Sequence, residues 1–436
     1  MPNIYIETYG CQMNLNDSEI VSAILTDEGH EITADIDAAD VIFLNTCSVR
    51  ENAEDRILKR LENLNHYRKR NRRLVVGVLG CMAERLRQRL IGMRDIVSIV
   101  VGPDEYRRLP ELIESAAAGE PGIAVKLSRT ETYEDILPLR TDGVSAWLSI
   151  MRGCNNFCSY CVVPYTRGRE RSRPAESLLD EVRLLAEKDY REFTLLGQNV
   201  NSYNCPASSM DFADLLDRAA GIAPSTRFRY TTSHPRDMSD RLIETMAARD
   251  NICNHIHLPV QSGSDHMLDA MNRGYSAGHY LGRIDKIREF MPKAAISTDI
   301  IAGYPGETEA DHQATLDLIR SVRYDGAFMF KYSPREGTRA YKLEDDVPDE
   351  VKLRRLNEII DIQNKIAAEI NKSEKGRRHE ILVEGPSKRN PDEWSGRTMT
   401  NKVVIFPNPA REYSRGDLVR VEIARSTSAT LFGKII

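Results

Sequence analysis

The sequence predicts an α/β protein with three domains: a parallel α/β domain, a partial (β/α)6 barrel and a small antiparallel β-barrel. Three observations lead to this prediction. Strands and helices alternate through residues 1–118, the alternation resumes with six units in residues 145–372, and residues 373–436 change to short strands separated by turns. Strand–helix alternation is typical of a parallel sheet, whereas a run of short strands is typical of a sandwich or barrel.

The composition is that of a globular protein. The chain has 436 residues, 41% hydrophobic and 29% charged, so it can bury a sizeable core over two or three domains. No apolar run is long enough for a transmembrane helix, and MPNIYIETYG lacks the features of a secretory signal. We therefore expect a cytoplasmic protein without membrane contact, whose cysteines stay reduced. The net charge of −5 gives no overall attraction to nucleic acid, so such contacts must be local.

The first domain is predicted from three strand–helix units. The strand candidates are NIYIETYGC, DVIFLNTC and RLVVGVLGC, and a helical stretch follows each of them. In the first of these helices Ile20, Ile24 and Leu25 share one face. Residues 119–144 carry Gly, Pro and mixed charges without periodicity, so we interpret them as a connector.

The second domain is predicted from six strands alternating with helices such as ESLLDEVRLLAEK. The strand candidates are AWLSIM, EFTLLG, RFRYTT, HIHLPV, AAISTDIIAG and GAFMFKYS. Six units are too few for a closed eight-unit barrel but suit an open, partial one. In such barrels the chemistry lies at the carboxyl ends of the strands.

The third domain follows a long helix, VKLRRLNEIIDIQNKIAAEINK. Its strand candidates are HEILVEG, TNKVVIF, DLVRVEIAR and ATLFGKII, which suit a small antiparallel barrel. Residues 373–436 hold 12 Lys and Arg against 8 Asp and Glu, an excess that an ordinary solvated surface also shows. Small β-barrels recur as oligonucleotide binders, so RNA binding is a hypothesis for this domain.

Three cysteines in GCNNFCSYC, Cys154, Cys158 and Cys161, directly follow the first barrel strand. Three thiolates can hold three irons of a [4Fe–4S] cluster and leave the fourth iron open, and an open position distinguishes a catalytic metal site from a structural one. The alternatives are a zinc site completed by a distant His or Cys and a chance grouping. The C-x3-C-x2-C spacing is not typical of zinc, so we favour an iron–sulfur cluster.

Three further cysteines, Cys11, Cys47 and Cys81, are far apart in the sequence, but each ends a predicted strand. Successive strands of a parallel sheet bring their carboxyl ends to one edge, where such folds bind ligands. Any one of these cysteines alone is more typical of an ordinary buried residue. Together they predict a second three-coordinate cluster, whereas Cys205 and Cys253 fit neither pattern.

Together these motifs resemble the radical S-adenosylmethionine (SAM) methylthiotransferases. GCNNFCSYC resembles the radical SAM signature, and Cys11, Cys47, Cys81, HLPVQSGSD and a TRAM-like terminal barrel extend the resemblance over essentially the whole chain. VVPYTRGRERSR and LLGQNVNSY resemble the branch of the family that acts on tRNA. The branch that modifies a ribosomal-protein aspartate has different residues in those two stretches.

The resemblance implies two [4Fe–4S] clusters, with SAM as both radical source and methyl donor. The cluster on Cys154, Cys158 and Cys161 would bind SAM at its open iron and cleave it after one-electron reduction. The other cluster would carry the sulfur that is methylated and delivered to adenine C2 of N6-isopentenyl(dimethylallyl)adenosine beside the anticodon. Adenine C2–H is neither acidic nor electrophilic enough for polar substitution, so a radical route is chemically sensible. The implied partners are tRNA, an electron donor and a sulfur source, and we expect a monomer.

SAM contacts are implied at several strand ends. Gly197 and Gln198 follow TLL, Ser233 ends YTTS, Gln261 lies in HLPVQSG, and Tyr160 would pack near the adenine. The residues alone are equally compatible with polar groups that merely cap strands.

Four arginines, Arg167, Arg169, Arg171 and Arg173, alternate along YTRGRERSR. A charge run is usually a solvated face, but this one begins six residues after the cysteine loop. Because arginine binds phosphate in a bidentate manner, we predict that these residues hold the RNA backbone. KRNRR at residues 69–73 is a weaker candidate.

Two other functions stay open on the sequence alone. In the same class, the substrate would be threonylcarbamoyladenosine in tRNA or a ribosomal-protein aspartate. In a different class, the chain would be a non-catalytic iron–sulfur protein that binds RNA. Formation of 5′-deoxyadenosine from SAM under reduction separates catalysis from binding.

Overall fold

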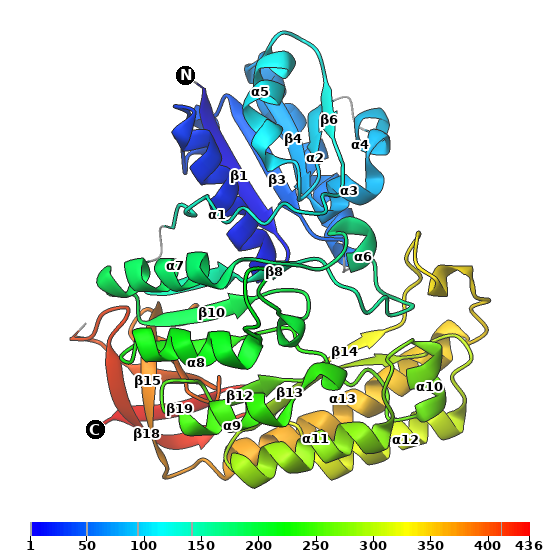
Figure 1. Ribbon diagram of the computed structural model, residues 1–436, viewed down its shortest axis with the longest axis vertical. Coiled ribbons are helices and arrows are strands. Elements are labelled where there is room, and N and C mark those ends of the chain that lie inside the picture. The colour runs from blue at the N-terminus through cyan, green and yellow to red at the C-terminus, as the bar shows by residue number, and fades with distance from the viewer. Residues whose placement is uncertain (1, 49–50, 94–95, 141–142, 411) are drawn as a thin grey trace.

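A six-stranded parallel sheet forms the centre of the N-terminal domain. The computed structural model describes every residue except 1, 49–50, 94–95, 141–142 and 411 (Figure 1). The strand order is β2-β1-β3-β4-β5-β6. The strands are β1 Asn3–Tyr9, β2 Glu31–Ile32, β3 Val41–Thr46, β4 Val75–Gly80, β5 Val97–Val101 and β6 Gly122–Ala124. The strands predicted from the sequence, β1, β3 and β4, are direct neighbours. β6 extends the sheet into the predicted connector, of which residues 141–142 lie outside the described residues.

Helices cover both faces of this sheet. The helices are α1 Gln12–Asp27, α2 Glu51–Arg70, α3 Cys81–Leu86, α4 Gln88–Met93 and α5 Leu109–Ala117. One apolar cluster joins the sheet to α1 and α5, and a second joins its other face to α2, α3 and α4. β3 and β4 are therefore buried along their whole length, which explains their continuous apolar sequences.

The second domain is the expected open barrel of six parallel strands. The strands are β7 Ser145–Ser149, β10 Glu192–Leu196, β11 Arg227–Tyr230, β12 His255–His257, β13 Ala295–Ala302 and β14 Gly326–Lys331. They form two runs, β7-β10-β11 and β12-β13-β14, joined by a single bridge between Phe228 and Ile252. The barrel is therefore open between its two edge strands, β7 and β14.

The barrel helices lie outside the strands in the order that the sequence predicts. They are α7 Ala175–Glu187, α8 Phe212–Ile222, α9 Asp240–Ala248, α10 Asp265–Ala270, α11 Ala277–Phe290, α12 Glu309–Val322 and α13 Asp349–Lys372. Many begin at a capping side chain; Ser239, Ser276 and Thr308 each accept a backbone N–H hydrogen bond at the start of a helix. In the described part of the chain, no helix combines the length and apolar character needed to cross a membrane.

The C-terminal domain is a closed five-stranded barrel in the order β15-β16-β17-β19-β18. The strands are β15 Arg378–Pro386, β16 Glu393–Thr398, β17 Val403–Pro407, β18 Leu418–Ser426 and β19 Leu431–Ile435. The sequence did not indicate β16, whose residues EWSGRT are mostly polar. The barrel is also not wholly antiparallel, because β17 and β19 pair in parallel.

The turn between β16 and β17 docks this domain on the amino-terminal end of the partial barrel. The Arg229 guanidinium donates hydrogen bonds to the carbonyl oxygens of Thr398 (2.7 Å) and Met399 (3.3 Å). Lys402 pairs with Asp325 at 2.8 Å, just before β14 begins. The cysteine loop after β7 lies at the opposite, carboxyl end of the strands, so this docking leaves that end open.

Candidate active site

Cys11, Cys47 and Cys81 lie at one edge of the N-terminal sheet, as the register of its strands predicts. Cys11 caps the start of α1, Cys47 directly follows β3, and Cys81 begins α3. A hydrogen bond between the Cys11 and Cys47 thiols, together with the positive charge of Arg167, lowers the pKa of Cys11 to about 6. Thiolate is the form that binds metal, so Cys11 is ready to bind one, whereas burial raises the pKa of Cys81.

Two glycines allow these cysteines to approach one another. Gly80 has a φ of +89°, and a Cβ there would lie 2.6 Å from the Thr46 carbonyl oxygen. A Cβ on Gly10 would lie 2.8 Å from Cβ of Cys47. Both distances are far below van der Waals contact, so only glycine fits before Cys11 and Cys81.

Cys154, Cys158 and Cys161 lie on the loop that leaves the carboxyl end of the first barrel strands. Gly153, at a φ of +78°, brings this loop against the backbone of Arg169, where a Cβ would overlap the carbonyl group. Burial raises the pKa of Cys154 to about 11 and that of Cys161 to about 12. Without a positive centre these thiols stay protonated near neutral pH, so metal binding must release their protons.

One buried arginine contacts a thiol in each set. Arg167 donates from Nε to the Cys81 sulfur at 3.2 Å, and Arg273 donates from Nη1 to the Cys158 sulfur at 3.2 Å. Hydrogen bonds to ligand sulfurs stabilise the anionic form of an iron–sulfur site and tune its reduction potential.

The residues present fit iron–sulfur clusters better than single ions. All six thiols are free of disulfides. In a zinc site the sulfurs lie about 3.8 Å apart, since each is about 2.3 Å from the ion. Among the described residues, the atoms of neither cysteine set lie all within 4.8 Å of one another. A wider spacing suits a polynuclear centre, and three thiolates leave one iron without a protein ligand.

The two sets lie on segments that meet at the contact between the first two domains. Helix α3, which begins at Cys81, contacts the short helix α6, Val163–Thr166, which follows Cys161 (Figure 1). Asp17 of α1 is wholly buried there, with its carboxylate 2.9 Å from Arg152 and 2.7 Å from Arg167. The two arginines outweigh the effect of burial and lower the pKa of Asp17. This charged cluster fixes one cysteine edge relative to the other.

Comparison with known proteins decides the family. The chain is 55% identical over 434 residues to a tRNA-2-methylthio-N(6)-dimethylallyladenosine synthase of Chloroherpeton thalassium, a match that covers 99% of this chain and 96% of that protein. It is 53% identical to the enzyme of the same name from Phocaeicola vulgatus, over 99% and 95% of the two chains. The chain belongs to this family of radical SAM methylthiotransferases.

Family models and solved structures agree with the domains of this methylthiotransferase. Residues 3–102 match the model described as uncharacterized protein family UPF0004, residues 148–319 the radical SAM superfamily, and residues 372–436 the TRAM domain. A radical SAM methyltransferase of Kitasatospora setae, TsrM, solved with cobalamin and a [4Fe–4S] cluster, superimposes with a TM-score of 0.60. The match covers 78% of this chain and 77% of that one at 15% identity, so it supports the fold alone.

The predicted SAM contacts of the methylthiotransferase lie on one rim, at the carboxyl ends of β10, β11 and β12. Gln198 accepts a hydrogen bond from the Gly153 amide, beside Cys154, and Ser233 donates to the His257 carbonyl oxygen. Gln261 has a φ of +74°, a backbone conformation that is uncommon for a non-glycine residue.

The other two predicted SAM contacts, Tyr160 and Gly197, are held in position by the residues around them. Tyr160 packs against the apolar cluster around Met267, and its hydroxyl accepts a hydrogen bond from Arg273. A Cβ on Gly197 would lie 2.5 Å from Cγ of Met151, so the strand end passes close to the cysteine loop there. Gly197, Gln198, Ser233 and Gln261 thus follow three strand ends of the rim, whereas Tyr160 lies on the cysteine loop.

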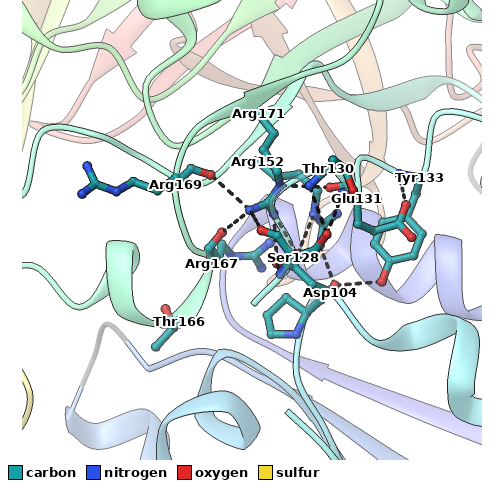
Figure 2. Close-up of polar contacts among 12 residues, drawn as sticks. Asp104, Ser128, Thr130, Glu131, Tyr133, Arg152, Thr166, Arg167, Arg169 and Arg171 are labelled. Atoms are coloured by element: carbon teal, nitrogen blue, oxygen red, sulfur yellow. Dashed lines mark hydrogen bonds and ion pairs between the residues drawn. The ribbon is translucent and has the colours of Figure 1, made fainter. Parts of the chain in front are cut away.

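The arginine row is not the RNA-binding face that the sequence predicted. Arg167, Arg171 and Arg173 are buried and pair with Asp17, Asp104 and Glu181, respectively, at 2.7–2.9 Å. The prediction of RNA contact is wrong for these three because their guanidinium groups are already bound inside the protein. Arg169 is exposed, lies 4.3 Å from the centre of the Phe157 ring, and points away from the cluster in Figure 2.

Four residues with clear roles were missed from the sequence. Asp17, Asp104 and Arg152 hold the domain contact, and Arg273 reaches the cysteine loop from the segment after α10. Only Arg171 and Ser172 of YTRGRERSR form a strand, and Arg169 is exposed, so the alternation of arginines did not signal the buried partners. Nothing in the sequence connects Arg273 with Cys158, because the fold alone brings them together.

Proposed function

We propose that this methylthiotransferase places a methylthio group on adenine C2 of N6-isopentenyladenosine beside the anticodon of tRNA. The observation that carries the proposal is the pair of three-thiol sites on segments that meet at one domain contact. The product contains both a new C–S bond and a methyl group, so the sulfur must lie close to the centre that activates the C2–H bond. The wholly buried Asp17, paired with arginines from the barrel, maintains that proximity.

The cofactors are two [4Fe–4S] clusters and SAM, which when bound supply the radical chemistry, the sulfur and the methyl group. Cys154, Cys158 and Cys161 would hold one cluster, and Cys11, Cys47 and Cys81 the other. Arg273 and Arg167 each hold one of these thiols in place through a hydrogen bond. Gly197, Gln198, Ser233, Gln261 and Tyr160 would line the SAM site.

The tRNA would enter at the carboxyl end of the partial barrel. Arg169 remains the candidate there for a phosphate contact, because it is exposed and borders the cysteine loop. The TRAM domain lies at the other end of the barrel strands, so it would bind RNA outside the reaction chamber. We further propose that the enzyme is a cytoplasmic monomer. It would take electrons and replacement sulfur from separate donors.

The test is mass spectrometry of nucleosides from tRNA incubated anaerobically with the enzyme, SAM and a reductant. Matched tRNA with and without the isopentenyl group are compared. We expect an adenosine heavier by one methylthio group only in the isopentenylated tRNA. Deoxyadenosine without that product would keep the radical chemistry and refute the substrate.

A further inference from the structure

The last strand of the open barrel presents two exposed aromatic side chains. Phe328 and Phe330 of β14 are 57% and 39% exposed, although most large apolar side chains of this domain are buried. Residues two apart in a strand point to the same face, so these rings form one surface. Core packing within the described residues does not account for two exposed phenylalanines on an edge strand.

The register of the sheet shows that this surface faces the barrel interior. Phe328 lies opposite Asp299 of β13, and Phe330 lies opposite Ile301. Ile301 packs against the apolar cluster of Met267, Met271 and Tyr304, and Tyr160 of the cysteine loop packs against the same cluster. Met329, which points the other way, instead packs on the helix side of the sheet. The two rings, called the aromatic wall below, therefore lie beside Ile301, which shares its apolar cluster with Tyr160.

Four of the five predicted SAM contacts, all but Tyr160, lie on other strands than the two rings. Those contacts follow β10, β11 and β12, whereas β14 borders the open side of the barrel. A molecule that enters through this side would meet Phe328 and Phe330 before it reached the rim.

The polar groups beside the wall are few and held in place. Asp299 lies 3.4 Å from Nε2 of His257, and Nδ1 of the same ring lies 3.0 Å from the Ser297 hydroxyl. The Phe328 ring packs edge-on against His257, with centres 5.8 Å apart. A broad apolar wall with a few fixed polar groups at its edge is typical of a site for a mostly apolar ligand.

We propose that Phe328 and Phe330 bind the isopentenyl group and the adjoining face of the modified adenine, and so select prenylated tRNA. This inference rests on the proposed function. The isopentenyl group is a branched hydrocarbon that gains from leaving water, and the purine can pack against an aromatic ring. A threonylcarbamoyl group carries a carboxylate and a hydroxyl, which gain nothing from packing on two phenyl rings. The wall thus also explains why one modified adenosine is preferred over the other.

The test compares binding of two anticodon stem-loops, one isopentenylated and one not, to the anaerobic enzyme loaded with clusters and SAM. The variant is Phe328→Ala/Phe330→Ala, with Phe328→Ser as a milder change at the more exposed ring. Phe290→Ala is the matched control, because Phe290 is a partly exposed ring on α11 that packs only with Lys286 among the ring contacts seen. Iron content and the thermal transition establish that each variant is folded and loaded.

We expect the wild type and Phe290→Ala to bind the isopentenylated loop more tightly than the unmodified loop. In the double variant we expect this ratio of affinities to be about tenfold smaller. An unchanged preference overturns the inference, as does equal weakening of both loops, which would mean that the wall serves the RNA in general. Weaker SAM binding with an unchanged preference also overturns it, because the wall would then line the SAM site. If the wild type forms no methylthio product, the proposed function itself fails and the inference fails with it.

Discussion

Replacing Asp17 with asparagine should uncouple the first two domains. Asn keeps the shape of the side chain but removes the charge, and leaves Arg152 and Arg167 buried, with side chains 1% and 4% exposed. At 3 Å and an effective dielectric constant of 20, one ion pair contributes about 5 kcal/mol before desolvation is subtracted. Breaking a buried pair by removing one partner costs about 3–5 kcal/mol in measured cases. We predict a loss of that size in the free energy of unfolding.

The assay is anaerobic guanidinium unfolding followed by tryptophan fluorescence in a Trp394→Phe background. The remaining Trp147 lies in β7, and its carbonyl oxygen accepts a hydrogen bond from Asn16 of α1 at 3.2 Å, so its signal reports on this domain contact. Asp317→Asn is the control, because Asp317 is 62% exposed and pairs with Arg320 on the same helix. Such a surface pair contributes about 0–1 kcal/mol. If Asp17→Asn costs no more than this control, the argument that buried charge holds the cysteine edges together is wrong.

Three other perturbations test separate parts of the structure. Cys11→Ala should remove about half of the bound iron, measured against protein concentration, since one of two clusters is lost; a full complement would refute the second site. Burial raises the pKa of Glu84 to about 7 from 4.5, so the folded chain keeps a proton that the unfolded chain releases, and unfolding free energy should fall as pH rises from about 5 to 7. Glu84→Gln should abolish that fall in denaturation curves at several pH values, and an identical fall in the variant would contradict the assignment. Arg229→Met should lower the unfolding free energy of the C-terminal barrel by about 2 kcal/mol in Trp394 fluorescence, because two carbonyl groups lose a charged donor; an unshifted transition would mean that the docking turn contributes little.

The cysteine sites were predictable because they depend on strand order. A parallel sheet with apolar strands has one carboxyl edge, so Cys11, Cys47 and Cys81 had to approach one another once their strands were neighbours. Cys154, Cys158 and Cys161 lie within one loop and needed no fold at all. The six barrel strands were likewise visible as apolar runs between helices.

The arginine row shows where sequence reasoning fails. A run of charges has the same appearance whether it faces solvent or a set of buried carboxylates from another domain. Asp17 and Asp104 lie 150 and 67 residues away from Arg167 and Arg171 in the sequence. Burial of charge is stable only with such partners, and local sequence does not reveal them.

Strand β16 and the aromatic wall were not predicted from the sequence for a related reason. The residues of β16 are polar because one face is solvated and the strand gains its stability from closing the barrel. Phe328 and Phe330 looked like ordinary core residues of an apolar strand. Only their exposure in the folded chain distinguishes a ligand-binding wall from packing.

The most direct test of the account is to remove the cluster site of Cys11, Cys47 and Cys81 by alanine substitution and follow both products in one reaction. The two cluster sites share the chemistry. This variant should therefore still form 5′-deoxyadenosine from SAM under reduction, but it should leave isopentenylated tRNA without a methylthio group. Alanine at Cys154, Cys158 and Cys161 should abolish both products. Methylthiolated adenosine from the first variant would contradict the division of labour, and so would deoxyadenosine from the second.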